Sequence, residues 1–247
     1  MNLVPNSTIE RISVVRRGLL ASLVLVALQV SPVILQAAES EVVSQTFSFQ
    51  ANDWNETVDL PLFDSALGTL TAITFQLDAT VMGVAAYESL DGSAQTITLR
   101  LGAEIGVGAP AGLVGVAEMV ATSPTIEIVE NASPFDGVID LDGSSGSNFA
   151  ALSQSDSSSV TYDDSNPLWE FSIRDYFTTG TPGSTVELPV SAVARSSGTG
   201  TPNLLTMLQT NSGGELTVSY TYTAIPEPGS LLLLSSGLLL LARRRRG

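Results

Sequence analysis

The chain has 247 residues, with 10 basic side chains against 25 carboxylates, so its formal charge is −15, and it contains no cysteine and no histidine. Every basic side chain is an arginine. These absences exclude a disulfide framework, a zinc site of cysteine and histidine ligands, a thiol nucleophile and a Ser-His-Asp triad.

Residues 1–38 have the layout of a secretory signal peptide. Three arginines precede an apolar run over 19–30, and Pro32 ends that run ahead of Ala37 and Ala38. The run is shorter than the about 20 residues that a membrane span needs, which favours a cleaved signal helix over a stable anchor. We expect the secretion machinery to export the chain and a peptidase to cleave it close to Ala37 and Ala38.

Residues 39–223 show alternation of apolar and polar side chains, which is typical of β-strands with one buried face. The alternation is clearest over 73–79 and 96–101. It recurs, more briefly, over 47–49, 126–128, 186–190 and 216–222. Asp-Gly and Gly-rich turns separate these runs, for example at Asp91-Gly92. We therefore predict antiparallel strands joined by short loops.

The expected fold is all-β, with one domain over 39–223. Ten or so strands exceed what one sheet can bury, so we predict an antiparallel two-sheet β-sandwich of jelly-roll or Greek-key type. A signal helix and a C-terminal hydrophobic helix would flank it. The Gly-rich stretch 102–115 and the Ser-rich stretch 144–159 are expected to be loops or edge strands.

The charge of this body limits its partners. Between residues 39 and 225 the chain has three arginines and 23 carboxylates, a net charge of −20. Such a surface repels nucleic acid and anionic lipid. We expect partners that are cationic or neutral, or metal ions.

Several fragments of the body, taken in their order and spacing, resemble a bacterial surface module, the choice-of-anchor E domain. The fragments are LPLFDSALGTL at 60–70, LDGS at 90–93, FDG at 135–137, LPVSA at 188–192 and VSYTY at 218–222. The resemblance implies a surface role for a domain that occurs with interchangeable C-terminal anchors. It implies no catalytic residue, because that family has no established activity.

Two sets of residues in the body are candidates for binding. Asp136, Asp140 and Asp142 lie close together in FDGVIDLDG, and carboxylates crowded in a loop suit calcium, although the spacing is not that of an EF-hand. Trp54 and Trp169 have carboxylates and amides nearby and could stack on sugar rings. The alternatives are solvated turn aspartates and core tryptophans. We expect no other cofactor.

The last residues, 224–247, combine a Pro-rich turn, an apolar segment over about 229–242 and four terminal arginines, Arg243, Arg244, Arg245 and Arg246. Twelve apolar helical residues reach only about 18 Å, so the segment is a marginal membrane anchor. Arginines beyond an apolar helix prefer the cytoplasmic side, which leaves the body outside. This is the layout of a stop-transfer element.

Pro226, Glu227 and Pro228, followed by the apolar segment and the four arginines, closely resemble the PEP-CTERM protein-sorting signal of Gram-negative bacteria. The alternative is a plain tail-anchor helix. The resemblance implies that an exosortase, a transpeptidase-like membrane enzyme, removes the tail and passes the protein towards the cell surface and its exopolysaccharide. The motif residues would then be a substrate site. Two prolines keep the backbone around Glu227 extended, which suits entry into an enzyme cleft.

Together these patterns predict an exported, non-enzymatic surface or matrix protein, anchored transiently in the inner membrane and sorted by an exosortase. The alternative is a carbohydrate-binding module for the cell's own exopolysaccharide. A hydrolase is the third hypothesis, and it would need two carboxyl groups about 5–9.5 Å apart.

Overall fold

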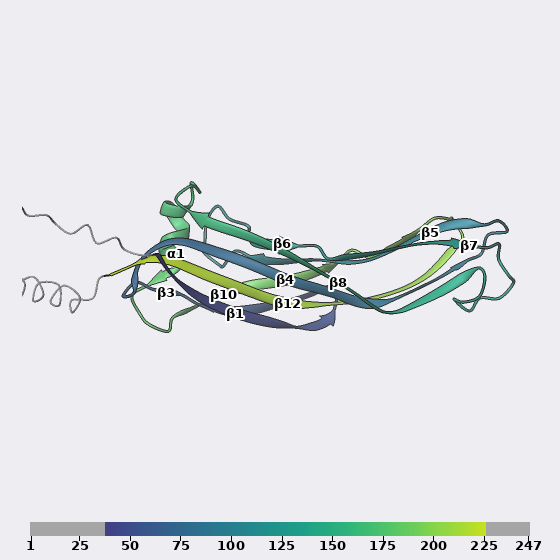
Figure 1. Ribbon diagram of the computed structural model, residues 1–247, viewed down its shortest axis with the longest axis horizontal. Coiled ribbons are helices and arrows are strands. Elements are labelled where there is room, and N and C mark those ends of the chain that lie inside the picture. The colour runs from purple at the N-terminus through teal and green to yellow at the C-terminus, as the bar shows by residue number, and fades with distance from the viewer. Residues whose placement is uncertain (1–37, 226–247) are drawn as a thin grey trace, which may run out of the picture. The chain divides into compact units, whose positions relative to one another are not determined.

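The structure is a computed structural model that describes residues 38–225. It confirms the predicted all-β class, because antiparallel strands make up most of this part of the chain (Figure 1). The predicted signal helix and C-terminal hydrophobic helix lie outside the described residues. Within 38–225, no helix has the length and apolar character needed to cross a membrane.

The first sheet has four antiparallel strands. In spatial order they are β1 (Ala38–Ala51), β12 (Leu204–Ala224), β4 (Gly68–Ser89) and β8 (Gly146–Asp163). The two central strands, β4 and β12, pair over almost their entire length, from Ser89 opposite Leu204 to Gly68 opposite Ala224. At 22 and 21 residues they are about twice the length of the longer strands in ordinary globular proteins.

The second sheet is centred on one strand that changes partners midway. Its strands are β2 (Trp54–Pro61), β10 (Thr185–Ala194), β5 (Gln95–Gly108), β11 (Ser197–Thr199), β6 (Glu118–Thr122) and β7 (Thr125–Ala132). The first half of β5 pairs with β7 and β11, and the second half pairs with β6 and β10. The interruption between β6 and β7 contains Pro124, which has no N–H to donate to the ladder.

The strand order is that of a jelly roll. If β6 with β7, and β10 with β11, are each counted as one interrupted strand, the eight strands form one sheet in the order 1-8-3-6 and one in the order 2-7-4-5. Two four-stranded sheets with this double Greek-key connection define the jelly-roll sandwich. A short parallel pair, β3 (Phe63–Asp64) and β9 (Thr178–Thr179), lies outside the two sheets.

The predicted alternation of apolar and polar side chains is present in the strands, and its apolar side chains form the core. Ile73, Phe75 and Leu77 are fully buried, while the residues between them face outward. Apolar side chains from both sheets meet in two clusters. The larger has 28 buried residues, and the smaller comprises Ala85, Tyr87, Ile97, Leu99, Leu101 and Ala132.

Three local features differ from the sequence-based expectation. Phe49 is half exposed, because the β1–β12 register shifts between Phe47 and Gln50. Residues 102–108 of the Gly-rich stretch belong to the central strand β5 instead of a loop or an edge strand. Two short helical segments were not predicted: η1 (Trp169–Ile173), a turn of π-helix, and α1 (Arg174–Tyr176).

Candidate functional site

Both ends of the folded body lie at the same end of the sandwich. β1 begins with Ala38, which pairs with Thr223 near the end of β12. We call this the exit end; it contains residues 38 and 225 and the loops 62–67, 109–117 and 164–184 (Figure 1). The opposite end, which we call the far end, consists of the loops 90–94, 133–145 and 200–203.

The chain stays attached to the sandwich until immediately before the predicted sorting motif. Ala224 pairs with Gly68, and the backbone N–H of Ile225 donates to the carbonyl oxygen of Leu67 at 3.1 Å. The motif Pro226, Glu227 and Pro228 starts at the next residue. The motif, the arginines Arg243 to Arg246 and the predicted cleavage residue Ala37 lie outside the described residues, whereas Ala38 is the first residue of β1.

Aromatic packing and hydrogen bonds hold the last residues of strand β12 in place. The ring of Phe63 lies 5.1 Å from that of Tyr222 and 6.0 Å from that of Tyr220, measured between centroids. The Tyr220 hydroxyl donates to the carbonyl oxygen of Pro61 at 2.7 Å, and the Tyr222 hydroxyl donates to Glu39 Oε2 at 3.0 Å. Burial raises the pKa of Tyr220 well above its usual range, and the hydrogen bond to Glu39 raises that of Tyr222.

Large apolar side chains are exposed at the exit end. Leu67 and Ile225, which share the backbone hydrogen bond, are 41% and 57% exposed. Phe171 on η1 is 88% exposed, and Figure 1 shows the neighbouring helix α1 near the same end. An exposed phenylalanine on a rigid turn is a common feature of interaction surfaces.

The three aspartates predicted to bind calcium lie in the 133–145 loop of the far end. Asp136, Asp140 and Asp142 each accept a hydrogen bond from a backbone N–H in their own turn, at 2.8–3.1 Å, from Val138, Asp142 and Gly143. Within residues 38–225, no three carboxylates come together in a way that could hold a metal ion. The observed geometry is that of turn aspartates that stabilise their own loop, and calcium binding here remains a prediction.

Glu88, which the sequence reasoning did not single out, is completely buried beneath this loop. Its Oε2 accepts from the backbone N–H of Leu141 at 3.0 Å, and its Oε1 accepts from the Ser145 hydroxyl at 2.5 Å. Two hydrogen bonds from one loop to one carboxylate tie the loop to strand β4. Nothing local in the sequence marks Glu88, because the loop that covers it is about 50 residues further along the chain.

The predicted sugar-stacking residues are buried. Trp54 is 7% exposed, lies 5.7 Å from the ring of Phe47 and donates from Nε1 to the Ser212 hydroxyl at 3.1 Å. Trp169 is 2% exposed and packs into the larger core cluster. We correct the prediction accordingly, because burying so much apolar ring area stabilises the fold and leaves neither ring face open to a sugar.

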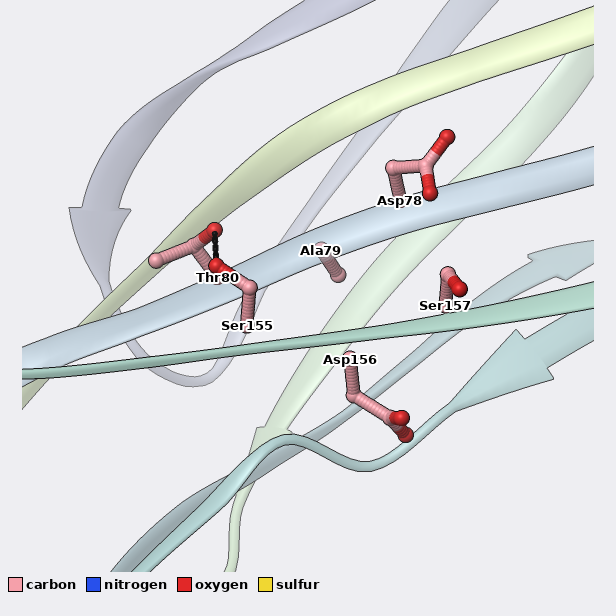
Figure 2. A pocket seen from close by; sticks show the side chains of 6 residues that line it. All are labelled: Asp78, Ala79, Thr80, Ser155, Asp156 and Ser157. Atoms are coloured by element: carbon pink, nitrogen blue, oxygen red, sulfur yellow. Dashed lines mark hydrogen bonds between the residues drawn. The ribbon is translucent and has the colours of Figure 1, made fainter.

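A hollow of about 380 Å³ lies over the β4–β8 pair and is drawn in Figure 2. It is lined by Asp78, Ala79, Thr80, Ser155, Asp156 and Ser157. Asp78 pairs with Ser157 whereas Asp156 pairs with Ala79, so the two carboxylates point to opposite faces of the sheet, as Figure 2 shows. The hollow therefore does not bring its two carboxylates together as an acid/base pair.

Asp156 has a structural partner. The Thr122 hydroxyl on β6 donates to Asp156 Oδ2 at 2.6 Å, and this hydrogen bond lowers the pKa of the carboxyl. It joins an edge strand of one sheet to an edge strand of the other. A second hollow, also about 380 Å³, lies beside η1 at the exit end, where Trp169, Glu170 and Arg174 face residues 69–72 of β4.

Comparison with known families gives a match to the PEP-CTERM protein-sorting motif over residues 224–246. The chain carries a PEP-CTERM sorting motif. The match begins at the last residue of β12 and includes Pro226, Glu227, Pro228 and all four terminal arginines. It implies export, transient anchoring by the tail and processing by an exosortase, a membrane enzyme. The resemblance of the body to the choice-of-anchor E domain gains no support.

No curated protein matches the chain. Among solved structures, two similar ones are particles of infectious bursal disease virus. The Gx strain structure is 13% identical with a TM-score of 0.12, and the T13 particle is 12% identical with a TM-score of 0.15. Each match covers 84% of this chain, which spans about half the length of the viral chains (49% and 47%). At these TM-scores the likeness carries no conclusion.

Proposed function

We propose that the protein is a non-enzymatic component of the bacterial cell surface or its exopolysaccharide matrix, delivered there through its PEP-CTERM signal. The observation that carries the proposal is the sorting motif at 224–246, which follows directly from the last strand of a folded jelly roll. In this proposal the folded body, residues 38–225, is the part delivered to the surface, and the tail is the sorting signal. The net charge of −20 over residues 39–225 keeps the body soluble through repulsion between its molecules.

The test replaces Pro226, Glu227 and Pro228 with alanine in a bacterium that has an exosortase. We expect the variant to stay membrane-bound and full length, because the extended backbone that the enzyme reads is lost. The readout is intact mass and immunoblotting of membrane and surface fractions after a pulse of expression. Processing of the alanine variant at the normal rate would show that the motif has no such role.

The chain offers a matched control in the same tail. Replacing Ser235 and Ser236 with alanine changes two residues of the apolar segment and leaves the motif and the arginines intact. This control should be processed like the natural protein. If both variants stay full length, the defect lies in membrane insertion and the assignment to the motif is lost.

Carbohydrate binding is the second candidate, and the outer face of the first sheet favours it. Hydroxyl groups pair across neighbouring strands there, at 2.7–3.0 Å. The pairs are Ser40 with Ser219, Ser44 with Thr217, Thr74 with Thr161, and Thr80 with Ser155. Rows of hydroxyls offer donors and acceptors to a polyol. Asp78 and Glu215, which lie opposite each other on β4 and β12, share this face and can accept hydrogen bonds from sugar hydroxyls. Here the ligand would be the cell's exopolysaccharide, on a face that contains neither Trp54 nor Trp169.

A pull-down with the purified exopolysaccharide tests this candidate. Replacing Thr74 and Thr80 with glutamate should abolish binding by the full-length protein, since added charge displaces a neutral sugar chain. The control replaces Thr96 and Thr98 on β5 of the second sheet in the same way. Equal binding by both variants, or no binding by the natural protein, would remove the candidate.

A further inference from the structure

We infer that the exit end of the sandwich, through Leu67, Ile225 and Phe171, is a docking surface for the membrane enzyme that processes the tail. The inference rests on the proposed sorting function and adds a partner surface on the folded body. It follows from three features of the exit end: the missing spacer before the motif, the anchoring of β12, and the chemistry of the exposed side chains.

The first feature is that no spacer separates the body from the motif. Ile225 is still hydrogen-bonded to Leu67, and Pro226 is the next residue. An extended chain advances at most about 3.6 Å per residue, so Glu227 lies within about 7 Å of Ile225. An enzyme whose cleft holds the motif must therefore touch the exit end.

The second feature is that β12 resists peeling away to create such a spacer. It is a central strand, so Thr223 pairs with Ala38 on one side and with Thr69 on the other. Releasing Thr223 would break two ladders, and releasing Tyr222 would also break its ring contact with Phe63 and its hydrogen bond to Glu39. The motif is thus presented by a folded body.

The third feature is the chemistry of the surface. Leu67 and Ile225 form an apolar spot, and η1, which carries the 88% exposed Phe171, lies beside the first residues of β4. Glu170 and Asp175, on either side of Phe171 in the sequence, both form ion pairs with Arg174, at 3.1 and 3.5 Å, so these three groups carry a net charge of −1. Asp163 and Asp164 line the same hollow beside η1 and add two further carboxylates. Anionic lipid is repelled by this negative charge, whereas a protein with an apolar pocket and basic groups fits the surface. The charge therefore favours the enzyme over the bilayer.

The experiment measures processing rates of full-length variants by pulse-chase in an exosortase-containing bacterium. Replacing Leu67 and Phe171 together with glutamate should slow tail removal about tenfold, and each single change about threefold, the loss expected for central interface residues. Both side chains are exposed, so the thermal unfolding midpoint should be unchanged. An unchanged processing rate in the folded double variant would overturn the inference.

The matched control changes two exposed apolar residues at the far end. Val138 and Ile139 are 55% and 61% exposed, and their replacement with glutamate adds the same charge. This variant should be processed at the natural rate. Equal slowing in both double variants would assign the effect to net charge and would also overturn the inference.

A linker variant separates docking from simple obstruction. Inserting six Gly and Ser residues between Ile225 and Pro226 uncouples the motif from the exit end, so processing should slow and should no longer respond to changes at Leu67 and Phe171. Faster processing would mean that the body only obstructs the enzyme. The natural protein and the variant with alanine at Pro226, Glu227 and Pro228 are measured in the same experiment. If neither is processed, the proposed function fails. If the natural protein is processed and the rate does not change with substitutions at the exit end, only the docking surface is removed.

Photo-crosslinking identifies the partner directly. A benzophenone amino acid at position 171 should capture a tagged exosortase, and the same group at position 139 should not. Capture of lipid alone at position 171 would assign this surface to the membrane and overturn the inference.

Discussion

The exit half of the sandwich, which we define by the larger core cluster, and the far half, defined by the smaller cluster of six residues, are held together in different ways. In the exit half, 28 buried residues form one cluster, and within residues 38–225 the aromatic ring contacts join members of this cluster or Tyr176, which packs against it. In the far half, six buried residues form the core, and polar groups hold the loops: Glu88 binds the 133–145 loop, and Asp91 accepts from Asn203 at 2.7 Å. The end that presents the motif is thus fixed by apolar packing, and the opposite end by hydrogen bonds.

The largest expected effect comes from Phe75 in the exit half. Its ring lies 5.9 Å from Tyr162 and 5.6 Å from Phe177, so Phe75→Ala leaves a cavity in the aromatic core. We expect the free energy of unfolding to fall by about 3–5 kcal/mol, measured by urea denaturation. Leu99→Ala in the smaller cluster should cost about 2–3 kcal/mol, at the low end for such changes. A larger loss for Leu99→Ala than for Phe75→Ala would contradict the contrast between the halves.

A smaller, local effect is expected at Glu88. Glu88→Gln keeps one acceptor oxygen and leaves either the Leu141 N–H or the Ser145 hydroxyl without its carboxylate partner. The free energy of unfolding should fall by about 1–3 kcal/mol, and limited proteolysis should cut within 133–145. Glu130→Gln on the exposed part of β7 is the control. If the two variants were equally resistant to protease, Glu88 would not hold the loop.

The smallest effect is the alkaline response of Tyr220. Burial raises its pKa, so the folded protein keeps the phenol proton above pH about 10, where the unfolded chain releases it. The resulting stabilisation is fully present below about pH 10 and is lost as the pH rises above it. Tyr220→Phe should flatten this dependence and cost about 1 kcal/mol at neutral pH through the lost bond to Pro61. Burial raises the pKa of Tyr87 and Tyr162 in the same direction, so a residual slope should remain.

The fold was largely predictable because its determinants are local. Alternation along residues 73–79 and 97–101 marks one buried face, and Asp-Gly turns mark where strands end. The expectation that the Gly-rich stretch is a loop or an edge strand was wrong for a physical reason, because residues 102–108 belong to the central strand β5. Gly102 lies where β5 changes partners, and a Cβ there would come within 2.9 Å of the Thr125 hydroxyl, so the glycine reflects close approach of neighbouring strands.

The sites were less predictable because they depend on contacts between distant parts of the chain. Trp54 and Trp169 have polar neighbours in the sequence, but the fold places both indoles in the core. Glu88 follows a strand pattern as an outward residue, and its burial requires the loop over 133–145. The sorting motif was predicted because it is a linear signal, read by its own order of residues.

Intact mass of the protein from the cell-surface fraction tests the central claim most directly, since one spectrum reads both ends of the chain. The account predicts a species that begins near residue 38 and ends near Pro228, with or without an added group from transfer. A surface species that retains Arg243 to Arg246 would contradict it, because the tail would then be a permanent anchor.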